Sequence, residues 1–198
     1  KGDQSKAFSD VPRPGFDKGL RSASDVSQFA HARPTYVDTR PNHLRGYSIK
    51  KPWDQPKLLA NAVRRSRTSW KLAATVDRRG LVASQQLFGI WAKESNVSLE
   101  VMCAILNGPV ASAFSRGHSV GARLLVSAIK NIPIPHELPN TVADKVRKYV
   151  SAINDHGTVL SASNDLVSGL LNEVDAEILQ AYDLPPRLER ALLEQFRK

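Results

Sequence analysis

The sequence contains a single cysteine, no long apolar run and no secretory signal. With Cys103 alone, the chain cannot form an internal disulfide, which excludes a disulfide-stabilised secreted scaffold. Cys103 lies in an apolar stretch, so we expect a buried thiol in a protein of the reducing cytoplasm. No run of about 18 apolar residues occurs, which excludes a hydrophobic membrane-spanning helix. The first ten residues are polar and lack the apolar core of a signal peptide.

Motifs that carry catalysis or hold cofactors are also missing. The sequence has no GxGxxG, no Walker A loop, no HExxH and no paired CxxC. Its five histidines are far apart and show no metal-ligand spacing, so we expect no metal site. Ser119 lies within Gly117–Gly121, which matches the letters GxSxG, but no apolar strand precedes it and no helix follows. A small serine hydrolase around Ser119 is therefore a minor alternative, and no catalytic residue is assigned.

Positive charge is in excess, and it is concentrated in one segment. The 198 residues carry 28 Lys and Arg against 19 Asp and Glu, which gives a net charge of +9 and a pI near 9.9. Residues 40–80 hold eleven basic and two acidic residues, so their net charge of +9 equals that of the whole chain. Such a concentration suits phosphate contacts, because each neutralised phosphate releases condensed counterions. The segment predicts a polyanionic partner; the alternative is a solvated basic face without a partner.

Two sets of side chains are candidates for DNA contact. The first set is expected on an exposed connection between two strands and comprises Arg64, Arg65, Ser66, Arg67, Thr68, Ser69 and Lys71. Arginine forks match phosphate oxygens and guanine edges, and short hydroxyl side chains donate to phosphates. The second set comes from the following turn, the next strand and a glycine-bearing loop: Arg78, Arg79, Gln85, Gln86, Arg116, His118 and Arg123. The alternative for the glycine-bearing loop is a flexible surface turn.

Apolar patterning predicts an α+β fold with a small, mostly antiparallel sheet and packed helices. Strands are expected in a meander or hairpin pair over residues 58–63, 70–76, 81–84 and 86–92, with Gly80 at positive φ in a turn. Ser98 is expected to cap a helix that ends at Gly108 in the left-handed conformation, before Pro109. A short helix over residues 110–114 and an extended segment over residues 124–134 complete a core that spans residues 50–138.

Residues 1–49 are expected to form an irregular N-terminal arm or a linker. Six of the twelve prolines fall within residues 1–56, and the apolar residues there show no sustained period. The alternative is an arm that packs onto the body through aromatic side chains, namely Phe8, Phe16, Phe29, Tyr36, Tyr47 and Trp53. The missing initiator methionine is consistent with a fragment of a longer protein.

Residues 139–198 are expected to form a helical hairpin or bundle within the same domain. The first two helices are predicted from apolar positions at helical spacing: Val142, Val146, Tyr149, Val150, Ile153, Val167, Leu170, Leu171, Val174, Ile178 and Tyr182. Asn164–Asp165 is expected to cap the second helix, and Pro186 to open a last helix. The core face of that last helix is predicted to consist of Leu188, Leu192 and Phe196. Residues 161–198 carry a net charge of −3, which favours packing or domain docking over DNA contact.

Several sequence blocks, taken in order, carry a resemblance to a known family. The blocks are residues 53–61, 64–73, 76–81, 85–91, Ala104–Ala111 (AILNGPVA), Ile132–Pro135 (IPIP) and Val174–Arg190. Together they resemble the C-terminal region of N6-adenine DNA methylases of restriction-modification type. The order and spacing of the blocks carry the resemblance, which covers residues 50–198.

The resemblance implies a target recognition domain that binds double-stranded DNA beside an upstream methyltransferase domain. In this family the upstream domain binds S-adenosylmethionine and carries an NPPY-type motif against the flipped adenine. The present sequence has neither that tetrapeptide nor a glycine-rich cofactor loop, so we expect it to bind no cofactor and to transfer no methyl group alone. The other open hypothesis is a protein-interaction or dimerisation module, for example a homodimer, that uses the acidic C-terminal helices.

Overall fold

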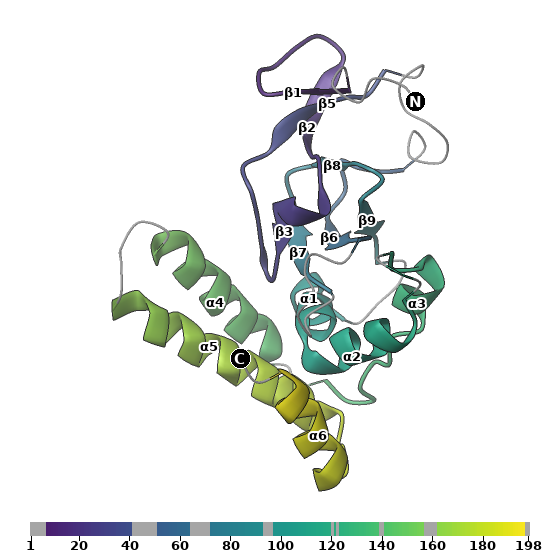
Figure 1. The fold of residues 1–198 in the computed structure, drawn as a ribbon. Helices are drawn as coiled ribbons and strands as arrows, with labels where there is room; N and C mark the ends of the chain where they lie inside the picture. Colours follow the sequence, from purple (N-terminus) through teal and green to yellow (C-terminus); the bar gives the residue numbers. More distant parts are fainter. Residues whose placement is uncertain are drawn as a thin grey trace.

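The fold, seen in a computed structural model, places short sheets above a layer of helices (Figure 1). The structure describes residues 7–40, 51–63, 72–92, 97–119, 121, 123–138, 141–156 and 162–196. Mixed helix and strand content confirms the predicted fold class. Among the described residues, no helix is both long and apolar enough to cross a membrane.

A three-stranded antiparallel sheet forms the centre of the molecule. Its order is β7-β6-β9, with β6 at Lys57–Asn61, β7 at Ala74–Asp77 and β9 at Leu87–Ile90. All five residues of β6 are buried, because the strand is covered on both faces. Alternation along the strand sends Leu58 and Ala60 toward the helices and Leu59 into a second apolar cluster, with Leu20 and Leu81. The turn after β7 is confirmed, since Gly80 has a φ of 76°.

The sequence interpretation was wrong for β8, Val82–Ala83, which does not join this meander. It pairs in parallel with β2, Phe16–Leu20, in a four-stranded sheet of order β1-β5-β2-β8. Gly19 permits the close approach, because a Cβ atom there would meet the backbone carbonyl of Val82. A partner some sixty residues away leaves no periodic signal in the local sequence.

The N-terminal segment also differs from the predicted irregular arm. Between residues 7 and 40 the chain forms β1 (Phe8–Ser9), β2, the 3-10 turn η2 (Ala23–Asp25), β3 (Val26–Ser27), β4 (Ala30–His31) and β5 (Thr35–Asp38). These strands have two to five residues each, too few for a periodic pattern to emerge. The turn between β3 and β4 packs on the body, because the Phe29 ring meets the Tyr149 ring edge-on at 5.1 Å.

Two consecutive helices support the central sheet from below. Helix α1, Leu99–Asn107, begins as predicted, since the Ser98 side chain accepts a hydrogen bond from the backbone N–H of Val101. Gly108 has a φ of −74°, so the predicted left-handed conformation is wrong. The reason is that the chain turns at once into α2, Pro109–Gly117, and Gly108 is the N-cap of that helix. The predicted extended segment over residues 124–134 is corrected too, because it contains the short helix α3, Val126–Lys130.

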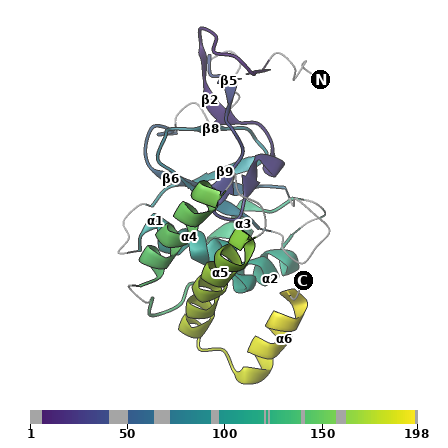
Figure 2. The ribbon, with the colours of Figure 1, turned by 90° about the vertical axis from the view of Figure 1, so that its left-hand side faces the viewer.

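The C-terminal part is helical, as predicted. Helices α4 (Val142–His156) and α5 (Ala162–Ala181) pack on each other and on α1, with α6 (Pro186–Phe196) at the end of the chain (Figure 2). The predicted core positions Val142, Val146, Tyr149, Val174 and Ile178 are all buried. Helix α5 begins before the predicted cap at Asn164–Asp165, so that boundary was wrong.

Helix α6 begins at Pro186, as predicted. Its apolar face is only partly covered, because Phe196 is buried whereas Leu188 is 59% exposed. The predicted core face is therefore correct at the C-terminal end of α6 and wrong at Leu188. The helix lies at the edge of the bundle (Figure 2).

Candidate nucleic-acid interface

One end of the central sheet brings three of the predicted DNA-contacting segments together. Val63, the last described residue before the 64–71 connection, forms an isolated antiparallel bridge with Arg123. The backbone N–H of Leu124 donates to the carbonyl of Ala62 at 2.9 Å, and the N–H of Ala62 donates to the carbonyl of Gln86 at 2.8 Å. Val63, Arg123 and the start of strand β9 therefore meet at this end of β6.

Asn61 holds both ends of the 64–71 connection in place. Its buried side chain accepts from the backbone N–H of Ala73 at 2.7 Å and donates to the carbonyl of Val63 at 2.9 Å. Val63 and Ala73, which flank the connection, are thus joined through the side-chain amide of Asn61. Our sequence interpretation missed this residue; an isolated amide inside an otherwise apolar strand was the available signal.

The side chains of the first predicted set lie outside the described residues. Their contact with DNA stays a prediction for Arg64, Arg65, Ser66, Arg67, Thr68, Ser69 and Lys71. In the second set, five side chains are exposed at this end of the sheet: Gln85, Gln86, Arg116, His118 and Arg123. The His118 ring stacks on Phe114 with centroids 4.0 Å apart, and the Gln86 amide oxygen accepts from the N–H of Ala23 at 3.3 Å. These two side chains therefore already have partners within the protein.

Arg78 and Arg79 lie at the opposite end of the same sheet. They follow Asp77, which pairs with Lys57 at the first residue of β6. The five residues of β6 span four steps of extended chain, so its two ends lie about 13 Å apart. The predicted interface thus divides into two groups, one at each end of the central strand.

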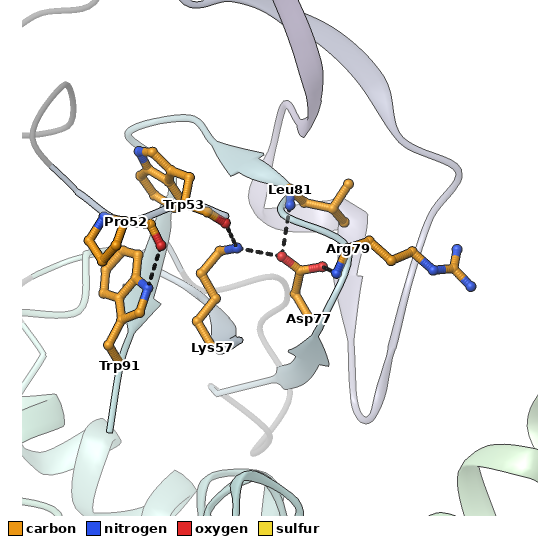
Figure 3. Close-up of polar contacts among 7 residues, drawn as sticks. All are labelled: Pro52, Trp53, Lys57, Asp77, Arg79, Leu81 and Trp91. Carbon is orange, nitrogen blue, oxygen red and sulfur yellow. Dashed lines mark hydrogen bonds and ion pairs between the residues drawn. The ribbon is translucent and has the colours of Figure 1, made fainter. Parts of the chain in front are cut away.

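A buried ion pair fixes the turn that carries Arg78 and Arg79 (Figure 3). Lys57 Nζ lies 2.5 Å from Asp77 Oδ2 and donates to the carbonyl of Trp53 at 2.6 Å, and both charged side chains are fully buried. The Asp77 carboxylate also accepts from the backbone N–H groups of Arg79 and Leu81, each at 2.8 Å. Lys57, which counts toward the basic excess of residues 40–80, is therefore unavailable to a phosphate.

Arg78 enters a second ionic group with residues that the sequence interpretation missed. Its guanidinium lies 2.7 Å from Glu100, and the Arg147 guanidinium reaches the same carboxylate at 4.0 Å. Burial alone would raise the pKa of Glu100, but the hydrogen bond and the charge of Arg78 hold that pKa below its ordinary value. Arg147 also pairs with Asp144 at 2.5 Å. Arg78, Glu100 and Arg147 are far apart in sequence, so no motif could have revealed this group.

These arginines open onto a cleft of about 700 Å³ between the β3–β4 turn, the end of β7 and helix α4. Its lining includes four arginines: Arg33, Arg78, Arg79 and Arg147. All four are exposed to solvent. The Arg79 side chain points away from Asp77, to which only its backbone N–H donates (Figure 3). The cleft is therefore a cationic surface supported by a rigid, internally paired turn.

The described residues give no support for hydrolysis at Ser119. Ser119 follows the C-terminus of α2, not a strand, and its hydroxyl donates to the carbonyl of Arg116 at 3.2 Å. Cys103 is fully buried, as predicted, and burial followed by the charge of Glu100 raises the pKa of its thiol. In the described part of the chain, no group of three or more His, Cys, Asp or Glu residues could hold a metal ion.

Comparison with known proteins identifies the family. The TaqI-like C-terminal specificity domain matches residues 22–134. A search of curated protein sequences found no match. Among solved structures, the chain is similar to the Type IIL restriction-modification enzyme MmeI in complex with DNA, with a TM-score of 0.58 and 9% identity. The likeness covers 90% of this chain and 30% of the MmeI chain, and at this identity it shows a shared fold. Because the family match covers more than half of the sequence, the chain belongs to the TaqI-like C-terminal specificity domain family.

Proposed function

We propose that the chain is the DNA target recognition domain of an S-adenosylmethionine-dependent N6-adenine DNA methyltransferase of a restriction-modification system. The observation that carries the proposal is the family match over residues 22–134, which encloses the segment of net charge +9. The shared fold with MmeI, which was solved in complex with DNA, supports a duplex as the partner.

The proposed division of labour follows from the chemistry. A methyltransferase reaches the amino group of adenine only after the base leaves the stack, so another surface must hold the duplex meanwhile. In this chain, arginines supply phosphate contacts and forks for guanine edges, while Gln85 and Gln86 supply amides suited to adenine edges. Base contacts would set the recognised sequence, and phosphate contacts would set the register on the duplex.

The methyl-transfer chemistry is assigned to an upstream domain. The sequence has no NPPY-type tetrapeptide and no glycine-rich cofactor loop, so its residues do not fit S-adenosylmethionine. The chain spans 30% of the length of MmeI, which leaves room in such an enzyme for a separate catalytic domain. The proposed partners are double-stranded DNA and that methyltransferase domain, acting in the cytoplasm.

The proposal is tested by the salt dependence of duplex binding. The affinity of the chain for a mixed-sequence duplex is measured by fluorescence anisotropy at several salt concentrations, with wild type and an Arg64→Ala/Arg65→Ala/Arg67→Ala variant. If each arginine contacts one phosphate, the slope of log affinity against log salt falls by about 0.9 per residue, or about 2.7 in total.

A matched control separates this effect from general loss of charge. Arg187 and Arg190 lie exposed on the acidic helix α6, and their replacement by alanine should leave the slope unchanged. Circular dichroism of each variant checks the fold. A wild-type chain that fails to bind duplex at low salt would refute the proposed function, and an unaffected triple variant would remove the 64–71 connection from it.

A further inference from the structure

The cationic cleft beside α4 has its own lining residues and lies at the other end of strand β6 from Arg123. Its walls come from four parts of the chain: the segment from the β3–β4 turn to residue 34, the end of β7 with the turn after it, helix α1 and helix α4. Arg33 belongs to the first wall, Arg78 and Arg79 to the second, and Arg147 to the fourth. Four arginines from three of these parts line one hollow of about 700 Å³.

The carboxylates near the cleft neutralise only part of this charge. Asp77 is fully buried and paired with Lys57, so its charge is already balanced inside the protein. Glu100 faces Arg78 and Arg147, and Asp144 faces Arg147 from the same helix. Among the described residues, neither Arg33 nor Arg79 pairs with a carboxylate. Two cations therefore remain for an external anion.

The surroundings hold the cationic side chains close together before any ligand arrives. Glu100 is only 8% exposed and fixes Arg78 beside Arg147, so these two guanidinium groups need little reorganisation. The backbone of the Arg79 turn is fixed by the buried Asp77 carboxylate. Helix α4 adds Ser151 and Asn154 to the lining, at four and seven residues from Arg147, so the three side chains share one face. Guanidinium forks flanked by short polar groups are typical of phosphate recognition.

We propose that this cleft binds the sugar–phosphate backbone of the duplex, as a second contact at the far end of the central sheet from Arg123. The inference rests on the proposed function and adds Arg33 and Arg147 to the DNA-contacting residues. The two ends of β6 lie about 13 Å apart, close to the roughly 12 Å width of the major groove. One rigid sheet would thus present cations to the sugar–phosphate backbones of both strands that border the groove.

The experiment uses an Arg33→Gln/Arg79→Gln variant of the chain, because both side chains are exposed and lack carboxylate partners among the described residues. Duplex affinity is measured across a fourfold range of salt, from about 50 to about 200 mM. If each of the two arginines neutralises one phosphate, the slope of log affinity against log salt is smaller by about 1.8 in the variant. The fourfold rise in salt then weakens duplex binding by the variant about twelve-fold less than binding by wild type. An Arg187→Gln/Arg190→Gln variant is the matched control, and an Arg147→Gln variant should lower the slope further.

The outcomes distinguish the cleft from the function as a whole. If wild type binds duplex, and the Arg64, Arg65 and Arg67 substitutions weaken binding while the cleft variants do not, the cleft inference is overturned and the function stands. If wild type does not bind duplex, the function fails and the cleft inference fails with it. Poly-glutamate is the second probe: binding that depends on Arg33 and Arg79, without such dependence for duplex, would assign the cleft to an acidic protein and overturn the proposal.

Discussion

The buried Lys57–Asp77 pair makes the sharpest prediction about the stability of the specificity domain. We consider the substitution Lys57→Met, which keeps most of the side-chain volume but removes the charge. Lys57 donates a buried hydrogen bond to Asp77 and a partly buried one to the carbonyl of Trp53. Its loss leaves the Asp77 carboxylate buried with only two backbone N–H donors. Removing one partner of a fully buried pair costs about 3–5 kcal/mol.

The assay is urea unfolding followed by circular dichroism, from which the free energy of unfolding is obtained. Arg78→Met is the matched control, because Arg78 also pairs with a carboxylate but its side chain is 55% exposed. That change should cost less than about 1 kcal/mol. The double variant Lys57→Met/Asp77→Asn should recover part of the loss, because no uncompensated charge is left in the core. A Lys57→Met variant no less stable than Arg78→Met would refute the reasoning.

Three further predictions concern α1. Because the pKa of Glu100 is lowered in the folded state, its contribution to stability is present above the unfolded pKa, near 4.5, and is lost as pH falls through the folded pKa. The melting temperature of a Glu100→Gln variant should therefore depend less on pH below about pH 4.5 than that of wild type. The same pH dependence in both proteins would contradict this. Asn107 accepts from the N–H of Ala74 and donates to its carbonyl, at 2.8 and 2.9 Å, so Asn107→Ala should cost about 1–3 kcal/mol in urea unfolding. Cys103 is buried with a raised thiol pKa, so iodoacetamide should label it in urea but not in the native chain; equal labelling would show that α1 opens readily.

Local signals in the sequence predicted most helices and the central strands. Ser98 predicts the start of α1 because its side chain satisfies a backbone N–H that the first turn leaves free. Pro186 predicts the start of α6 because its missing N–H costs nothing at that position. The predicted strands over residues 58–63 and 86–92 contain β6 and β9 apart from Lys57 at the edge, since a short apolar run bounded by polar residues is typical of a strand. Such signals act within a few residues of the element they determine.

Errors arose wherever a short element depends on a distant partner. The segment over residues 124–134 begins extended through the hydrogen bond from Leu124 to Ala62 and then forms α3, a change that its apolar pattern does not distinguish. Strand β2 exists through pairing with β5 and β8, and its five residues give no recognisable period. The exposed Leu188 shows the same limit, because helical spacing locates a face but not what covers it.

The sequence by itself determined the class of fold, the family and the place of the basic excess along the chain, because composition, caps and ordered blocks are local properties. Only the tertiary structure decided which charges are available. It buried Lys57 against Asp77, and it separated Arg78 and Arg79 from Arg123 by the length of β6. It also gathered Arg33, Arg78, Arg79 and Arg147 around one cleft. The physical reason is that burial and proximity follow from how distant segments pack, which charge counts along a chain do not record.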